Sequence, residues 1–114
     1  MVNNRETGSR KEQYAADYLR KKGYDIYTMN FRCKIGEIDI IAKDAEYLVF
    51  CEVKYRTTVN YGYPEEAVNY RKQNRIRQVS RYYMLTNNID INTPVRYDVI
   101  AILGKELKHI RNAF

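Results

Sequence analysis

The sequence has very few residues of the types that bind zinc or form a covalent catalyst. Cys33 and Cys51 are its only cysteines, and His109 is its only histidine. No CxxC pair or cluster of histidine and cysteine is present, which argues against a zinc site. A Ser-His-Asp or Cys-His catalyst would depend on His109, near the end of the chain, so we expect none. Two separate thiols are typical of the reducing cytoplasm, where we expect the protein to act.

Long apolar runs are also missing. None approaches the roughly 20 residues that cross a bilayer. The first segment, MVNNRETGSRKEQ, is polar throughout, unlike a signal peptide. We therefore expect no membrane partner. The 114 residues, 45% apolar and 30% charged, have the composition of a globular protein and predict a single domain over residues 1–114.

Basic residues outnumber acidic ones, with 20 Lys and Arg against 14 Asp and Glu and a net charge of +6. Such a surplus favours a polyanionic partner through counterion release, although many basic proteins bind no nucleic acid. The excess is concentrated in residues 67–89, which contain no acidic side chain. Their basic residues are Arg71, Lys72, Arg75, Arg77 and Arg81.

Capping signals and apolar spacing predict two helical regions. The first is expected from Ser9 to Lys22, because Ser9 and Glu12 have capping-box spacing and Gly23 follows the last turn. The second begins at residue 64 and runs to about residue 85, either as one helix or as a short and a longer helix with a break near Tyr70. Its apolar face consists of Val68, Ile76, Val79 and Tyr83.

Alternating apolar residues predict strands before and after the second helical region. We expect strands at residues 24–30, 37–42, 47–54 and 94–103, with a short final strand at 107–111 as a further option. A four-residue turn at 43–46 joins the second and third strands into a hairpin. Helices on either side of a central hairpin predict an α/β fold with a mixed sheet.

The predicted hairpin has one apolar face and one divided face. A half-exposed hairpin would be polar along its whole outer face, and a fully buried one would carry no charges. The divided face is instead apolar near the turn and charged at the far end, which predicts a cleft. The apolar face consists of Ile38, Ile40, Ala42, Tyr47, Val49, Cys51 and Val53, and the divided face of Glu37, Asp39, Ile41, Leu48, Phe50, Glu52 and Lys54.

Two acids of the divided face form the candidate metal site. If Ala42 pairs with Tyr47, Asp39 lies diagonal to Glu52; a slip of two residues places the two acids directly opposite each other. Either register brings them close enough to share one cation, which relieves their repulsion. Carboxylates without histidine or cysteine favour Mg²⁺ or Mn²⁺. The alternative interpretation is a set of solvated surface charges.

Lys54 points to the same side as Glu52, two residues earlier. An ammonium there could orient the attacking water or stabilise charge that develops on a phosphate. Without its neighbours it would be read as half of a weak surface ion pair.

Five segments together resemble the YraN-like family of small bacterial proteins: GEIDIIA, LVFCEVKYR, YGYPEEAV, RYDVIAI and HIRNAF. The likeness covers nearly the whole chain. That family is similar to the PD-(D/E)xK nuclease superfamily and close in layout to archaeal Holliday junction resolvases. The resemblance implies a restriction-endonuclease-like core, in which helices flank a mixed central sheet.

The resemblance also implies roles for individual residues. Asp39 and Glu52 match the two metal-binding acids, and Lys54 matches the lysine of the motif. In our leading hypothesis the Val53 carbonyl is a candidate for a further metal ligand. Glu12 matches an acid that resolvases carry on the first helix, unless it only caps that helix. Lys72 matches a Gln or Lys position, unless it only extends from a packed face. Ile38 stands where the superfamily has proline.

Basic and aromatic residues surround the expected cleft. Arg71, Lys72 and Arg75 lie on the second helix, and tyrosines between the charges could stack on exposed bases. The alternative is a solvated helix face. The other basic residues near the cleft are Arg32, Lys34, Lys54 and Arg56, and the interleaved tyrosines are Tyr55, Tyr61, Tyr63 and Tyr70.

The leading hypothesis is Mg²⁺-dependent hydrolysis of phosphodiester bonds in DNA, with branched or structured DNA as substrate. Asp39, Glu52, Lys54 and Glu12 would form the catalytic site, and Asp98 is a weaker candidate. One alternative is a non-catalytic nucleic-acid-binding module that retains the nuclease fold. Another is an adaptor whose basic face meets an acidic protein. A homodimer would place two clefts against two strands.

Overall fold

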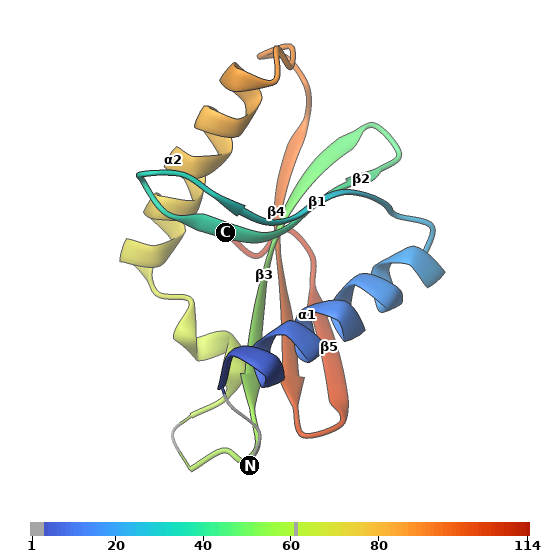
Figure 1. The fold of residues 1–114 in the computed structure, drawn as a ribbon, viewed down its shortest axis with the longest axis vertical. Coiled ribbons are helices and arrows are strands. Elements are labelled where there is room, and N and C mark those ends of the chain that lie inside the picture. The colour runs from blue at the N-terminus through green and yellow to red at the C-terminus, as the bar shows by residue number, and fades with distance from the viewer. Residues whose placement is uncertain (1–3, 61) are drawn as a thin grey trace.

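A five-stranded mixed sheet with helices on both faces forms the structure (Figure 1). The computed structural model describes residues 4–60 and 62–114. The predicted α/β fold class is confirmed, and the architecture is compatible with a restriction-endonuclease-like core. The elements are α1 (Asn4–Lys21), β1 (Asp25–Arg32), β2 (Glu37–Asp44), β3 (Tyr47–Arg56), the 3-10 helix η1 (Pro64–Ala67), α2 (Tyr70–Thr86), β4 (Val95–Leu103) and β5 (Glu106–Ile110).

Helix α1 starts earlier than predicted and ends at Lys21, one residue before the predicted end at Lys22. It already begins at Asn4, so Ser9 lies inside the helix and the predicted capping box is wrong. Gly8 did not prevent this extension, because one glycine costs a helix only about 1 kcal/mol. At the other end, Gly23 has a φ of 92° and the N–H of Tyr24 donates to the Leu19 carbonyl at 3.0 Å, which closes the helix with a Schellman-type turn.

The sheet order is β1-β2-β3-β4-β5, with only the β3–β4 pair parallel. The β2–β3 turn is shorter than predicted, because Asp44 pairs with Tyr47 and leaves only Ala45 and Glu46 in the loop. Ala45 has a φ of 53°, as tight two-residue turns require. The same register pairs Ile40 with Cys51. It is the second of the two registers considered, the one that places Asp39 opposite Glu52.

Each face of the sheet carries its own core. Ala15, Ala16 and Leu19 of α1 pack on one face, and Ile76 and Val79 of α2 pack on the other. Helix α2 follows η1 after a break at Asn69, so the two-helix option near Tyr70 is confirmed. None of the helices in the described part of the chain is long and apolar enough to cross a membrane.

Two residues leave the apolar face predicted for the hairpin. Ile38 belongs to the core under α2, together with its β1 partner Phe31, at a point where β2 is no longer paired to β3. Tyr47, at the turn, is exposed. The other residues of that face pack as predicted, and the apolar part of the divided face is buried under α2.

Candidate functional site

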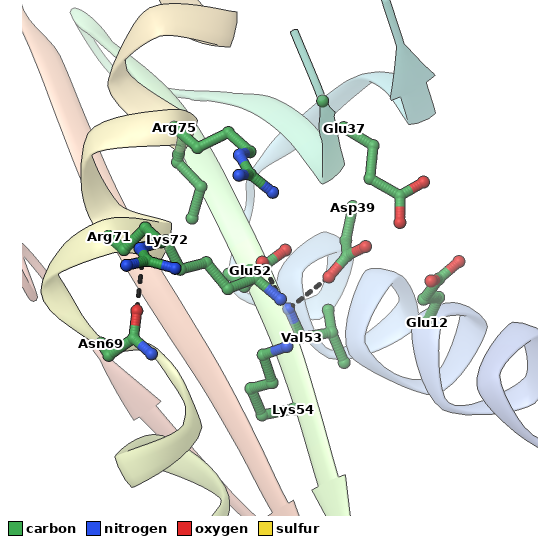
Figure 2. A pocket seen from close by; sticks show the side chains of 12 residues that line it. Glu12, Glu37, Asp39, Glu52, Val53, Lys54, Asn69, Arg71, Lys72 and Arg75 are labelled. Atoms are coloured by element: carbon green, nitrogen blue, oxygen red, sulfur yellow. Dashed lines mark hydrogen bonds and ion pairs between the residues drawn. The ribbon is translucent and has the colours of Figure 1, made fainter.

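A cavity of about 450 Å³ lies between α1, the ends of β2 and β3, and the start of α2 (Figure 2). It brings together all four residues predicted to be catalytic and three of those predicted to bind nucleic acid. Its acidic lining residues are Glu12, Glu37, Asp39 and Glu52, and its basic ones are Lys54, Arg71, Lys72 and Arg75. The predicted cleft is therefore present, with an acidic wall facing a basic one.

The cavity opens where β2 and β3 part. Pairing between these strands stops at Ile40 and Cys51, although β2 continues along β1 and β3 continues along β4. The next residues, Asp39 and Glu52, therefore stand at a fork in the sheet. Oδ2 of Asp39 accepts a 2.8 Å hydrogen bond from the backbone N–H of Val53, which fixes this carboxylate across the fork.

Strand geometry gives Val53 a second role at the fork. In an extended strand the N–H and C=O groups of one residue point to the same side. Because the Val53 N–H points to Asp39, its carbonyl faces the same opening. Two carboxylates and one carbonyl oxygen thus converge there.

Burial makes the two acids an electrostatically costly pair. Loss of water, followed by the neighbouring Glu52 carboxylate, raises the pKa of Asp39 to about 8. The Glu52 side chain is only 4% exposed, and its Oε2 lies 3.0 Å from Nζ of Lys72. The negative charge of the pair is therefore reduced in two ways: Asp39, with its raised pKa, holds a proton at neutral pH, and Glu52 is paired with an ammonium.

The two lysines of the cavity perturb each other. Burial and then contact with Lys72 lower the pKa of Lys54. Burial alone would lower the pKa of Lys72 as well, but hydrogen bonding to Lys54 and the charge of Glu52 outweigh it and raise that pKa. Lys54 is therefore the amine more readily available for proton transfer, while Lys72 carries the stable positive charge.

Glu12 enters the cavity from α1. Burial and then the charge of Asp39 raise its pKa, which places it within electrostatic reach of the acid pair. Since α1 begins at Asn4, Glu12 lies in the helix interior and cannot be a capping residue. The alternative interpretation, in which Glu12 only caps its helix, is therefore wrong. Its side chain lines the cavity.

The start of α2 provides the basic wall. Asn69 caps this helix by accepting a 2.9 Å hydrogen bond from the backbone N–H of Lys72. Arg75 crosses Gly36, where a Cβ atom would lie 2.9 Å from its Cδ. The sequence analysis gave no role at the site to Asn69, or to Gly36, which it noted only as the first residue of GEIDIIA. Asn is a favoured N-cap residue, so its position before the second helical region could have indicated the role of Asn69. No local pattern indicated that Gly36 would contact Arg75.

Other predicted nucleic-acid contacts lie outside the cavity lining. Arg32 bonds to Glu37 at 3.0 Å on the surface, Lys34 is exposed, and Arg56 lies at the far end of β3. Among the tyrosines, Tyr55 packs against Lys11, Tyr63 and Tyr70 are exposed, and Tyr61 lies outside the described residues.

Asp98, the weaker candidate, belongs to a separate buried network. It pairs with Cys51 in the sheet, so it lies on the face that packs against α1 and not on the face covered by α2. Its carboxylate accepts hydrogen bonds from Arg96 at 2.9 and 3.0 Å and lies 2.7 Å from His109. These contacts hold β4 and β5 together. Asp98 does not line the cavity.

The donor set fits a hard divalent cation. Among the residues that the structure describes, no three side chains of His, Cys, Asp or Glu form a metal-binding group. The fork offers instead the carboxylates of Asp39 and Glu52 and the Val53 carbonyl. Mg²⁺ is commonly held by one or two carboxylates with water in the remaining positions, so this small oxygen set suits it.

Fold and site together define an α/β protein with a carboxylate and lysine cavity at a strand fork. The chain belongs to the uncharacterised protein family UPF0102, whose model matches residues 11–102. A UPF0102 protein of Lachnoclostridium phytofermentans is 49% identical, over 99% of this chain and 96% of its own length. One of Clostridioides difficile is 47% identical, over 99% and 100%. These matches confirm the resemblance to the YraN-like family.

Proposed function

We propose that the protein is a metal-dependent nuclease that hydrolyses phosphodiester bonds in DNA, with branched or structured DNA as its substrate. The observation that carries this proposal is the meeting of Asp39, Glu52 and Lys54 in one cavity beside a basic helix. The two cysteines of the protein, Cys33 and Cys51, are free thiols, which is consistent with action in the reducing cytoplasm.

Asp39, Glu52 and the Val53 carbonyl would hold Mg²⁺, or Mn²⁺ in its place. The ion supplies Lewis-acid polarisation of a phosphate oxygen and of water. Asp39 must lose its proton to bind a cation, so binding at this site is favoured above the raised pKa of Asp39.

The remaining residues of the acidic wall and Lys54 act on water and protons. Lys54 has a lowered pKa and stands beside both acids, so it can orient the attacking water and exchange a proton with it. Glu12, whose pKa is raised, faces the same space from α1 and can accept a proton from that water or orient it.

The start of α2 would bind the phosphate backbone. Arg71 and Arg75 line the cavity and are exposed, and the first turn of α2 contains no acid. Guanidinium groups bind phosphate in a bidentate manner, and the positive end of a helix adds to their attraction. A DNA strand lying along this wall would present a phosphate to the acids of the fork.

Cleavage assays test the proposal directly. Purified protein is incubated with branched, flapped and linear DNA in Mg²⁺ or Mn²⁺, beside the Asp39→Asn variant and a sample in EDTA. We expect cleavage by the wild-type protein alone, with the branched or flapped substrates preferred. Equal cleavage by Asp39→Asn would assign the activity to a contaminant and refute this site.

A non-catalytic nucleic-acid-binding protein is the second candidate. One observation favours it: Glu52 forms an ion pair with Lys72, and Asp39 accepts a hydrogen bond from the Val53 N–H, so both carboxylates have partners within the protein. Such a protein would bind DNA in a salt-sensitive manner, with the same affinity in EDTA and in Mg²⁺, and would cut none of the substrates.

A further inference from the structure

Lys72 is bound to a residue that the proposed metal site also requires. Its Nζ lies 3.0 Å from Oε2 of Glu52, whose side chain is 4% exposed, whereas that of Lys72 is 37% exposed. A carboxylate so deeply buried needs a positive partner. In the structure that partner is the ammonium of Lys72, and in a metal-loaded site it would be the cation.

The two partners compete for the same carboxylate. A divalent ion held between Asp39 and Glu52 supplies more charge than one ammonium, and it removes the need for Lys72. Lys72 would then stand as a positive group between Lys54 and Arg75, which repel it. Its stem is flexible and partly exposed, so its ammonium can turn toward solvent while the backbone stays fixed by Asn69.

We propose that Lys72 is an exchangeable partner: it holds Glu52 in the metal-free protein and is released to bind a DNA phosphate when a divalent ion occupies the site. The inference rests on the proposed function, because it requires both the metal site and the DNA surface. It adds that metal loading and phosphate binding are thermodynamically coupled through one side chain.

Charge in the cavity shows why the coupling favours DNA. Four acidic and four basic side chains line it, so the metal-free cavity has little net charge to attract a polyanion. A divalent ion still adds positive charge to the cavity after Asp39 gives up its proton, and it frees Lys72 beside Arg71 and Arg75. By linkage, DNA bound to the released Lys72 must strengthen metal binding by the same factor.

Metal affinity without DNA provides the first test. Calorimetric titration with Mn²⁺ compares the wild-type protein with Lys72→Met and with Arg81→Met as the matched control, an exposed basic residue of α2 outside the cavity lining. Because Lys72→Met removes the competitor for Glu52, we expect it to bind Mn²⁺ several-fold more tightly, on the order of fivefold, with Arg81→Met nearly unchanged. Weaker Mn²⁺ binding by Lys72→Met would overturn the inference, since Lys72 would then support the ligand.

DNA affinity provides the second test, with fluorescence anisotropy of a labelled branched DNA in EDTA and in Ca²⁺. We expect Ca²⁺ to strengthen wild-type binding by about tenfold and Lys72→Met to lose most of that gain. Arg71→Met should weaken binding equally in both buffers. An equal Ca²⁺ gain in Lys72→Met refutes the exchange but leaves the proposed metal site standing. Absence of any metal binding by the wild-type protein refutes both.

A third variant tests release without any metal. Glu52→Gln removes the carboxylate that holds Lys72, so in EDTA it should bind DNA more tightly than the wild-type protein. The double variant Glu52→Gln, Lys72→Met should lose this gain. Circular dichroism verifies that both fold. Unchanged DNA affinity of folded Glu52→Gln in EDTA would contradict the proposed release.

Discussion

The backbone N–H of Val53 donates a 2.8 Å hydrogen bond to Oδ2 of Asp39. This bond joins β2 and β3 beyond the point where their regular pairing ends, and it replaces the ladder bond that the Val53 N–H would otherwise lack. It therefore holds one acid of the candidate site against the strand that carries the other. The fork in the sheet and the placement of the acids have the same structural origin.

Asp39→Asn should stabilise the metal-free protein while abolishing metal binding. The amide oxygen can still accept the hydrogen bond of Val53, and the substitution removes a carboxylate that burial and Glu52 disfavour. We expect a gain of about 1 kcal/mol in the free energy of unfolding, measured by urea denaturation in EDTA at pH 8. Asp25→Asn, at an exposed position of β1, is the control and should have little effect. A lower free energy of unfolding for Asp39→Asn than for the wild-type protein would show that the buried Asp39 carboxylate does not destabilise the fold.

The stability of the metal-free protein should fall as the pH rises from about 4 toward 8. Between the ordinary pKa of 3.8 and the raised value of about 8, folded Asp39 keeps a proton that the unfolded chain has released. Unfolding then releases a proton, so higher pH favours it. Melting temperatures recorded across this range test the slope. Asp39→Asn should have a flatter profile, and Mg²⁺ should stabilise the wild-type protein more at pH 8 than at pH 6.

Gly36→Ala should weaken DNA binding through Arg75. The new methyl group would lie 2.9 Å from Cδ of Arg75, so this side chain must leave its place beside the cavity. We expect a loss of roughly fivefold in DNA affinity in EDTA, equivalent to one exposed charge contact of about 1 kcal/mol. Anisotropy measurements on Gly36→Ala, Arg75→Ala and the double variant test this. The double variant should equal Arg75→Ala, and additive losses would argue against a shared cause.

Asp98→Asn should destabilise the fold without acting on the cavity. Asp98 is fully buried, and its loss leaves the Arg96 guanidinium without its bidentate partner. Removing one member of a buried pair costs about 3 kcal/mol. Asp44→Asn is the matched control, because Asp44 also bonds to Arg96 but its side chain is 26% exposed, and we expect a smaller loss. If urea denaturation shows equal losses in the free energy of unfolding for the two variants, burial of the carboxylate does not determine the size of the loss.

Lys54→Met should separate cleavage from binding. If Lys54 orients the water and exchanges its proton, its loss should reduce the cleavage rate by about 100-fold or more. DNA affinity in Ca²⁺ and the Mn²⁺ affinity should change far less, since other residues hold the ion and the phosphates. A loss of DNA affinity as large as the loss of rate would instead identify Lys54 as a binding residue.

The sequence determined the hairpin and the acids it carries. Alternation along residues 37–54 places Asp39 and Glu52 on neighbouring strands, and this information is local because a strand repeats every two residues. It left two registers open. The structure selects one of them through the two-residue turn at Ala45 and Glu46. The start of α1 was misplaced because the capping signal at Ser9 also fits the interior of a longer helix.

Only the tertiary structure decided which distant side chains complete the site. Glu12 and Lys72 enter the cavity, whereas Asp98 lies in a buried network on the α1 face of the sheet. Arg75 lies on Gly36, a contact between residues nearly 40 positions apart. These relationships depend on how α1 and α2 pack across the strands. Local periodicity reports the face on which a residue lies, but not the element that covers that face.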